Sequence, residues 1–394
     1  ACSCFYQRHI LLTAHLIRFY TSDFRGRDMY PKAKAWITTT TFLLIVFGFT
    51  FSFFICPDAG LSVSERRKLK QLPEINKESL TNGKFFDEFE EYMQDQFPAR
   101  ESLRTFKASA ELFLFMKADN NDIYLYKGHV CKQDYPLDGE AVVEAADKIN
   151  EIYRKLFDGK KAFYSIIPDK NYFLALPSGH LAYDYTSLFE IMDSRIAEDI
   201  HLIDVSRELS IKRYYKTDLH WKQEAIIPIA DIILSAMEES IPRRQYTEHK
   251  LEPFYGSYFG QAALPISADQ LIYLTNEILD DCTVYDPLQG EYSQLYEVAE
   301  FGGIDPYNIY LSGAKPILII TNPSNDTRKE LYIIRDSFSS SLAPLLVDNY
   351  SKVVLIDPRY IDPAVASKYI SPAEQSTILF IFSTTILNKG YLFR

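Results

Sequence analysis

Ser337 stands directly after an apolar run that is typical of a buried strand and just before a segment that is typical of a helix. In α/β proteins the carboxyl end of a strand presents catalytic side chains close to backbone N–H groups that can stabilise a developing oxyanion. The Ser337 hydroxyl is therefore a candidate nucleophile. Serine is also a good helix N-cap, so Ser337 could serve the helix alone. Ser339, Ser340 and Ser341 are the alternative nucleophiles, although we expect them to cap the following turn.

Asp218 and His220 stand two residues apart in the stretch RYYKTDLHW, just before an amphipathic segment. A neutral imidazole can accept a serine proton when one ring nitrogen faces the hydroxyl. A carboxylate on the other nitrogen fixes that tautomer and stabilises the resulting cation. One loop can supply both groups, so Asp218 and His220 complete a candidate acyl-transfer triad with Ser337. The alternative is that Asp218 caps the helix while His220 and Trp221 pack in the core.

The elements that would position these residues follow a βα pattern from Asp122 onward, where short apolar runs alternate with helical patterns. This alternation is typical of an α/β fold with a mainly parallel sheet. We expect strands over residues 162–167, 201–205, 316–321, 331–335, 353–356 and 377–382. We expect helices over residues 140–157, 223–237 and 340–347.

A stretch without charged residues runs from residue 35 to residue 56 and has about the length of a membrane-spanning helix. It is longer than the apolar region of a secretory signal, and the bulky residues at its end offer no cleavage site. We therefore expect an uncleaved transmembrane anchor over residues 35–56. Lys32 and Lys34 precede it and four basic residues follow it closely, so charge alone does not set its orientation.

Three further segments complete the expected organisation. The N-terminal tail covers residues 1–34, and we interpret residues 1–28, which precede the first methionine, as translated upstream sequence and not as a native element. Residues 57–121 are expected to form a neck and a helical stalk with a break at Pro98, because apolar and charged residues alternate there at helical spacing. The aromatic stripe of this stalk favours packing over a ligand surface. Residues 122–394 would then form the α/β domain.

Composition excludes one class of function but does not decide whether the chain contains a disulfide. The formal net charge of -11 argues against a nucleic-acid partner, because phosphate recognition needs clustered Lys and Arg. Cys131 and Cys282 follow the apolar stretch, and whether they form a disulfide stays open, since two cysteines without metal-like spacing carry little information. We expect no cofactor, and no metal site either, because the remaining histidines lack ligand spacing: His129, His180, His201 and His249.

Several blocks of the sequence occur together in the order found in one known family. They are LPEINKESLTNGKFFDEFEEYMQDQFPAR, IIPDK, LIDVSREL, YYKTDLHWKQEA, YNIYLSGAKP, IIRDSFSSSLAPLL and KVVLIDPRYI, spanning roughly residues 72–360. The chain thereby resembles the DHHW family of bacterial surface proteins, which are similar to the alginate O-acetyltransferases of the SGNH-hydrolase-like group. The resemblance implies a three-layer α/β sandwich with a mainly parallel sheet, preceded by the transmembrane helix and the helical stalk.

Carried over to this sequence, the resemblance implies that Ser337 is the nucleophile, that His220 is the general base and then acid, and that Asp218 orients the imidazole. Two positions depart from the pattern. The second histidine of the family's name motif is Leu219 here, which still leaves one imidazole for a triad. The glycine of the relatives' Gly-Asp-Ser is Arg335, so the oxyanion site would be built differently.

The resemblance also implies a substrate and a location. Arg359 in DPRY would line the pocket, and Tyr360 and Trp221 are expected to contact substrate. The implied function is that of a cell-surface O-acyltransferase or acylesterase acting on acetyl groups of an extracellular or cell-wall polysaccharide. A membrane-bound O-acyltransferase would be the partner that supplies the acyl group, and the catalytic domain would lie outside the cell. The alternative is a non-enzymatic polysaccharide-binding or export and assembly factor on the same fold.

Overall fold

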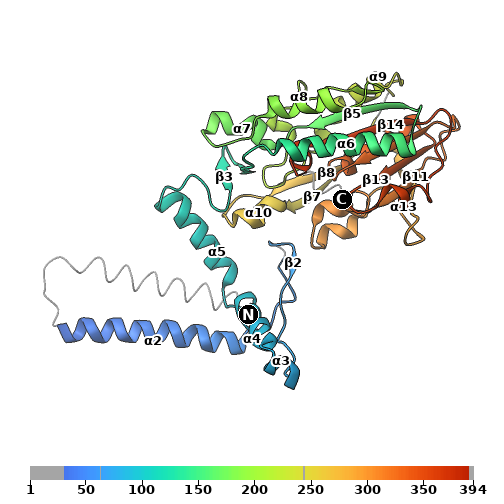
Figure 1. Ribbon diagram of the computed structural model, residues 1–394. Helices are drawn as coiled ribbons and strands as arrows, with labels where there is room; N and C mark the ends of the chain where they lie inside the picture. Colours follow the sequence, from blue (N-terminus) through green and yellow to red (C-terminus); the bar gives the residue numbers. More distant parts are fainter. Residues whose placement is uncertain (1–30, 63, 243–244, 390–394) are drawn as a thin grey trace. The chain divides into compact units, whose positions relative to one another are not determined.

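The chain divides into two units in the computed structural model, which describes residues 31–62, 64–242 and 245–389 (Figure 1). The first unit runs to Ser62 and continues over Lys68–Leu103, whereas the second contains Val63–Arg67 and everything from Arg104 onward. The tail 1–28, interpreted above as upstream sequence, lies outside the described residues. The expected domain boundaries after residues 34, 56 and 121 stay predictions.

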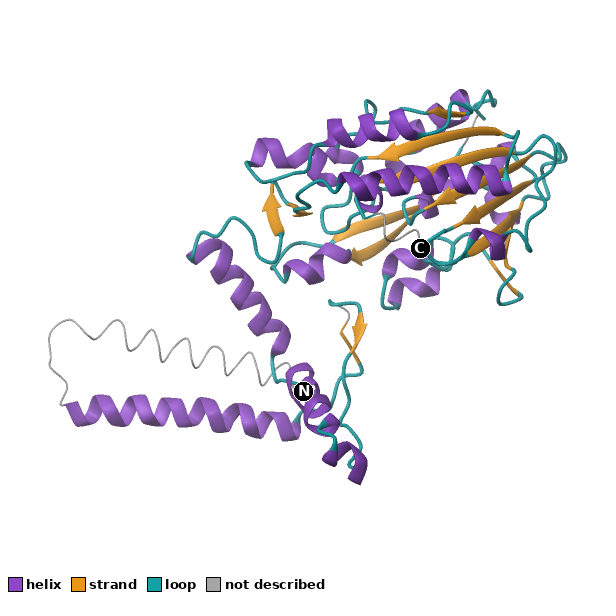
Figure 2. Cartoon of the chain, viewed as in Figure 1, coloured by secondary structure: helices purple, strands orange, loops and turns teal. Residues whose placement is uncertain are grey.

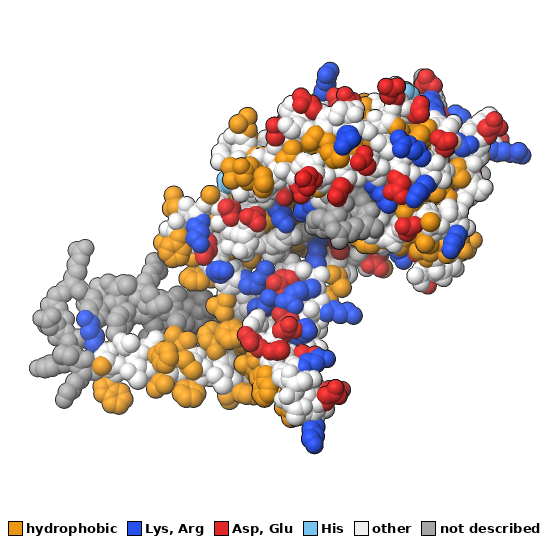
Figure 3. All heavy atoms as spheres, viewed as in Figure 1, with side chains coloured by type: hydrophobic (Ala, Val, Ile, Leu, Met, Phe, Trp, Pro, Cys, Tyr) orange, Lys and Arg blue, Asp and Glu red, His pale blue; other side chains and the backbone are white. Residues whose placement is uncertain are grey.

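The first unit begins with α2 (Pro31–Ile55), in which 23 residues from Ala33 are long and apolar enough to cross a membrane. Hydrophobic side chains are spread along this helix, and no residue of its apolar window is buried (Figure 3). The helix is therefore a candidate single-pass anchor, close to the stretch that the sequence indicated.

The expected stalk is helical and is interrupted at Pro98. Its helices are α3 (Lys77–Thr81), α4 (Lys84–Asp95) and α5 (Arg100–Ser109), the last of which continues into a π-helical turn, Ala110–Leu114. The short strands β1 (Leu61–Ser62) and β2 (Arg67–Lys68) precede them. Within α4, Phe85 stacks on Phe89 with ring centroids 5.7 Å apart, so part of the aromatic stripe packs on itself.

The second unit is built on an eight-stranded sheet in the order β10-β9-β11-β13-β12-β14-β5-β6 (Figure 1). The strands from β13 to β6 pair in parallel, and β11, β9 and β10 extend that sheet antiparallel at one edge. Their bounds are β5 (Lys161–Ile167), β6 (Ile200–Leu202), β9 (Thr283–Asp286), β10 (Glu291–Ser293), β11 (Ile317–Thr321), β12 (Glu330–Arg335), β13 (Lys352–Ile356) and β14 (Thr377–Ser383).

The central strands β5, β12, β13 and β14 are buried on both faces, which explains why they are nearly continuous apolar runs. Along β12, Leu331 and Ile333 pack into one hydrophobic cluster with the helices α9 (Ile227–Ala236) and α12 (Ser339–Leu342). Tyr332 and Ile334 pack into a second cluster with α6 (Gly139–Leu156) and α8 (Tyr185–Arg195). The unit is thus the predicted three-layer α/β sandwich with a mainly parallel sheet, and helices lie on each side of the sheet (Figure 2).

Two helical predictions need correction. The helix expected over residues 223–237 begins as a 3-10 turn, Gln223–Ala225, and becomes α-helical only at Ile227, where Pro228 suits the first turn. The helix expected over residues 340–347 is the short α12, and 3-10 turns follow because Pro344 lacks the N–H that would continue it.

Several short elements were missed in the sequence. Besides the pair of β1 and β2, the described residues form two hairpins outside the main sheet, β3 (Ile123–Tyr126) with β4 (His129–Lys132) and β7 (Thr247–Phe254) with β8 (Asp269–Thr275). The other helices are α7 (Lys170–Ser178), α10 (Ser257–Ala262), α11 (Glu277–Asp281), α13 (Pro363–Ala366) and α14 (Thr384–Leu387). Cys131 and Cys282 are free, buried thiols, so the disulfide left open above is not formed, and burial raises the pKa of Cys131 to about 11.

The strand order places a topological switch point at β12. The chain passes from β12 to β13 on one side and then to β14 on the other side. Because β13 and β14 pair with β12 on opposite sides, the carboxyl end of β12 lies at the kind of position where open α/β sheets bind ligands. Ser337 follows that end by two residues.

Candidate active site

The turn after β12 holds Ser337 in a fixed position. The fully buried carboxylate of Asp336 accepts a hydrogen bond of 3.0 Å from the Phe338 backbone N–H and one of 2.7 Å from the Ser383 backbone N–H. The first bond closes the turn around Ser337, and the second ties the turn to the end of the neighbouring strand β14. Asp336 therefore fixes the backbone of the turn that carries Ser337.

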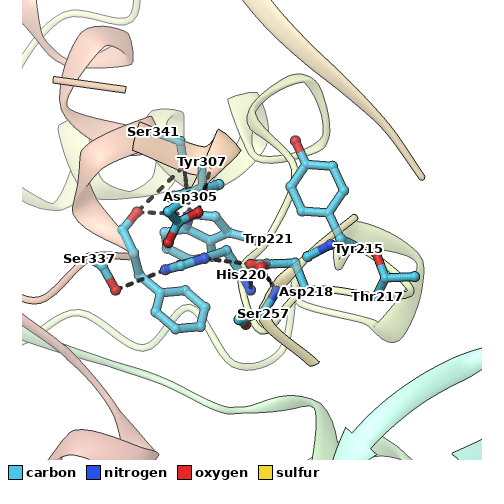
Figure 4. A network of polar contacts seen from close by, with 12 residues as sticks. Tyr215, Thr217, Asp218, His220, Trp221, Ser257, Asp305, Tyr307, Ser337 and Ser341 are labelled. Carbon is cyan, nitrogen blue, oxygen red and sulfur yellow. Dashed lines mark hydrogen bonds and ion pairs between the residues drawn. The ribbon is translucent and has the colours of Figure 1, made fainter. Parts of the chain in front are cut away.

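The side chains of Ser337, His220 and Asp218 form one hydrogen-bonded line (Figure 4). His220 Nε2 lies 2.8 Å from Ser337 Oγ, and His220 Nδ1 lies 2.6 Å from Asp218 Oδ1. The phenol ring of Tyr307 stacks on the imidazole with centroids 3.8 Å apart and planes 2° apart, and it is held by a hydrogen bond from its hydroxyl to Ser341 Oγ. The imidazole is thus fixed in its plane as well as at both nitrogens.

The loop that carries Asp218 and His220 rests on a buried lysine. Lys170, at the start of α7, donates hydrogen bonds to the carbonyl oxygens of Tyr215, Lys216 and Asp218 at 3.0, 2.9 and 2.9 Å. Burial lowers the pKa of Lys170. Lys170 therefore has a structural role, because its ammonium group ties together three carbonyl groups of the loop that carries Asp218.

A glycine makes room for the Asp218 side chain. A Cβ atom on Gly256 would lie 2.2 Å from Asp218 Cβ, closer than side chains can approach. The next residue, Ser257, begins α10 and donates its backbone N–H to Asp218 Oδ2 at 2.7 Å. Only a residue without a side chain at position 256 lets this helix start come close enough to hydrogen-bond the carboxylate.

Both oxygens of Asp218 are engaged, although the side chain is fully buried. Oδ1 accepts from the His220 backbone N–H at 2.9 Å and faces Nδ1, while Oδ2 faces the Ser257 N–H and the Arg66 guanidinium at 3.4 Å. Burial by itself raises the pKa of Asp218, but His220 and Arg66 outweigh it and hold that pKa well below its usual range. The carboxylate stays ionised, so Nδ1 carries a proton and Nε2 presents a lone pair to Ser337.

The hydroxyls of the three alternative serines are hydrogen-bonded to groups other than His220 or are buried without a partner. Ser340 Oγ accepts a 2.9 Å hydrogen bond from the buried guanidinium of Arg335, and Ser341 Oγ bonds to Tyr307 and Trp221. Ser339 Oγ is buried without a partner. Ser337 is therefore the serine of this turn that the structure brings to His220.

Of the residues expected to contact substrate, one is buried in the core and the other two lie at the edge of the sheet. Trp221 is fully buried, and its indole N–H donates to the Phe338 carbonyl at 3.0 Å, so it supports the Ser337 turn from within and does not line a pocket. Arg359 forms a two-point ion pair with Asp357 just after β13. Tyr360 is 54% exposed. Arg359 and Tyr360 thus lie at the same edge of the sheet as Ser337, and their contact with substrate stays a prediction.

Sequence reasoning missed the groups that flank the triad. Tyr307 and Asp305 come from a turn before β11, and Arg66 comes from the neck. The block YNIYLSGAKP had marked the Tyr307 region, but nothing in it indicated a ring stacked on an imidazole. Within residues 31–389, the described part of the chain contains no group of three His, Cys, Asp or Glu side chains that could hold a metal ion.

Comparison with known proteins supports the fold. The chain is similar to a DHHW family protein from Eubacterium siraeum, with 17% identity, a TM-score of 0.54, and coverage of 70% of this chain and 94% of the other. It is equally similar to PatB1 from Bacillus cereus, with 17% identity, a TM-score of 0.55, and coverage of 70% and 99%. A second PatB1 structure, which contains a sulfonyl adduct, matches at 17% identity and a TM-score of 0.53 over 69% and 97%.

At this level of identity the likeness establishes a shared fold, and to that extent the resemblance to DHHW proteins is confirmed. No protein-family model matches the chain. No curated protein sequence matches it either.

Proposed function

We propose that this protein is a cell-surface O-acyltransferase or acylesterase that uses Ser337, His220 and Asp218 to move acetyl groups of an extracellular or cell-wall polysaccharide. The observation that carries the proposal is the continuous line from Ser337 Oγ through His220, at 2.8 Å, to Asp218, at 2.6 Å. These are the distances and the order of groups that serine acyl transfer requires.

The first half of the reaction transfers the acyl group to the enzyme. Ser337 Oγ attacks the acyl carbon of the donor ester while His220 Nε2 takes the hydroxyl proton, and Asp218 stabilises the imidazolium that forms. The carbon–oxygen bond to the donor then breaks, and His220 returns the proton to the departing alkoxide. The product is an acyl ester on Ser337 and a free donor hydroxyl.

The second half transfers the group onward. A polysaccharide hydroxyl or a water molecule gives its proton to His220 Nε2 and attacks the acyl carbon of the Ser337 ester. The Ser337 oxygen then leaves and recovers a proton from the imidazolium. Transfer and hydrolysis differ only in which hydroxyl attacks, so the balance depends on how well water is kept from the acyl-enzyme.

Two features support the surface location and the glycan acceptor. The candidate anchor α2 precedes all of the sheet, so it would tether the catalytic unit to a membrane without entering its core. The resemblance to DHHW proteins and alginate O-acetyltransferases supplies the acceptor class and the export of the domain. It also supplies a membrane-bound O-acyltransferase as the partner that would deliver acetyl groups.

The test is covalent labelling of the full-length protein in detergent. After exposure to 4-nitrophenyl acetate, mass spectrometry of peptides should find an acetyl group on the peptide that contains Ser337. Ser337→Ala should leave that peptide unlabelled. Ser339→Ala is the matched control, because the buried Ser339 hydroxyl has no partner to lose, and it should be labelled like wild type.

A second probe follows from the comparison with PatB1, one structure of which contains a sulfonyl adduct. Phenylmethylsulfonyl fluoride should modify Ser337 here and block later acetylation. Equal acetyl labelling of wild type and Ser337→Ala would defeat the enzyme proposal and favour the non-enzymatic polysaccharide-binding or assembly role.

A further inference from the structure

Arg66 reaches the Ser337 site from the neck of the protein, eleven residues after the end of α2. It lies in the turn between β1 and β2, and its guanidinium touches two carboxylates. Nη1 is 2.7 Å from Asp305 Oδ2, and Nη2 is 3.4 Å from Asp218 Oδ2 and 3.2 Å from the Tyr255 carbonyl oxygen. The Arg66 side chain is 14% exposed and that of Asp218 is fully buried, so the contact between them is shielded from water, whereas Asp305 is 32% exposed.

The turn is built to dock on the α/β unit. A Cβ atom on Gly260 of α10 would lie 1.3 Å from the Ser64 carbonyl oxygen, so only glycine allows the two backbones to come so close. Arg104 donates to the Gly260 carbonyl oxygen at 2.8 Å and pairs with Glu65 at 3.5 Å, which joins the turn to α10 from the side. Arg66 itself has φ 54°, a left-handed conformation that costs a non-glycine residue about 1 kcal/mol. The contacts of the turn must offset that cost.

We propose, on the basis of the function proposed above, that Arg66 is a positioning residue of the Ser337 site. Asp305 anchors its guanidinium, and the guanidinium in turn holds the outer oxygen of Asp218, so that the inner oxygen faces His220. Arginine suits this task because its planar fork reaches both carboxylates and a carbonyl at once, whereas the single nitrogen of lysine cannot reach all three. The reactivity of Ser337 therefore depends on a turn of the neck.

If Arg66 positions Asp218 through its charge, its removal should change the pH dependence of the reaction, which the loss of a merely structural contact would not do. Arg66 keeps a positive charge beside a carboxylate that must stay ionised while fully buried. The same charge helps to hold the pKa of Asp218 below its usual range, so its removal should raise that pKa and let Asp218 take up a proton at higher pH. The other charged or titratable groups facing Asp218 and His220 are Asp305, Lys170, Asp336, Tyr215, Tyr258 and Tyr307.

The experiment measures the second-order rate constant for acetylation of Ser337 by 4-nitrophenyl acetate against pH, in the full-length protein. Arg66→Gln should lower the rate by roughly tenfold to 10²-fold, the range that a displaced catalytic group produces. Its acidic limb should also move to higher pH. Arg66→Lys should restore part of the rate, because it keeps the charge and loses the fork. Arg67→Gln is the matched control, since Arg67 pairs with Glu65 at 3.1 Å, and it should react close to the wild-type rate.

The outcomes separate this inference from the proposed function. If the wild-type protein is labelled at Ser337 and Arg66→Gln has the same rate and pH profile, the role of Arg66 is overturned and the enzyme proposal stays intact. Equal losses in Arg66→Gln and Arg67→Gln would also overturn it, because general charge or turn stability would then be the cause. A wild-type protein that is not labelled removes both proposals. If Arg66→Gln does not fold, Asp305→Asn is the variant to test, because it removes the anchor of the guanidinium without changing Asp218. A slower acetylation rate in Asp305→Asn supports the role of Arg66. A wild-type rate overturns it.

Discussion

Replacing Asp218 by asparagine should show whether the carboxylate sets the tautomer of His220. The substitution keeps the shape of the side chain and turns one of its two acceptors into a donor. In the wild type both oxygens face donors, Oδ1 the N–H and Nδ1 of His220 and Oδ2 the Ser257 N–H and the Arg66 guanidinium. In either orientation of the asparagine amide, its NH₂ group must therefore face at least one other hydrogen-bond donor.

The two orientations are not equivalent. With the amide nitrogen at the Oδ2 position, it opposes the Ser257 N–H and the charged Arg66 guanidinium, so two donor pairs face each other. With the nitrogen at the Oδ1 position, it opposes only the His220 backbone N–H, because Nδ1 can release its proton and become an acceptor. The second orientation should prevail. It leaves the proton of His220 on Nε2, which faces Ser337 and can no longer act as a base.

The size of the effect follows from the loss of the base without loss of geometry. In a serine triad the wrong tautomer costs about 10⁴-fold, which at 1.36 kcal/mol per tenfold is about 5.4 kcal/mol of transition-state stabilisation. The assay is the initial rate of Ser337 acetylation by 4-nitrophenyl acetate near pH 7. Asp204→Asn, a partly exposed carboxylate away from the triad, should react like wild type. A rate for Asp218→Asn within tenfold of wild type would refute the assignment of Asp218.

Two further predictions concern the parts that position the site. Gly256→Ala should lower the free energy of unfolding by about 1 to 3 kcal/mol and slow acetylation, because the added methyl group must displace Asp218. Gly302→Ala is the control, because a Cβ atom at Gly302 would meet no other atom within 4 Å, and it should change neither quantity. Urea unfolding and the labelling assay measure both, and a fully active, fully stable Gly256→Ala protein would contradict the close approach. A fragment that begins at Asp58 should be soluble and folded by circular dichroism, because all described strands follow α2; an unfolded or aggregated fragment would mean that the core needs the apolar helix.

The strands that the sequence predicted most closely, such as β14, are buried on both faces of the sheet. The strand over residues 377–382 was evident because the five apolar side chains from Ile378 to Phe382 alternate between two hydrophobic clusters. The hairpin of β3 and β4 was missed because its strands are only four residues long and its turn, at Lys127 and Gly128, is a weak signal. Short, half-exposed pairs carry too little apolar periodicity to be distinguished from loops.

The candidate site shows the same division between local and long-range information. Ser337 and His220 could be singled out because each lies beside a recognisable element, and the resemblance added their order along the chain. Arg66 could not be found, because its contact with Asp218 joins residues 152 positions apart and depends on a glycine in α10 that no local pattern explains. Trp221 was misjudged for a related reason, since an aromatic beside a catalytic histidine can support the site from within as well as meet a substrate.

The two departures from the family motif become intelligible in the geometry of the Ser337 turn. Leu219 packs against the large hydrophobic cluster while its neighbours Asp218 and His220 form the triad line, so a second histidine at position 219 is not needed by the hydrogen-bonded group. Arg335 occupies the position of a glycine, yet its side chain is fully buried and its guanidinium donates to Ser340 on the next helix. A glycine would allow the turn to flex, whereas the Arg335 bond ties the end of β12 to the start of α12. The Ser337 hydroxyl is thus held between fixed points on both sides.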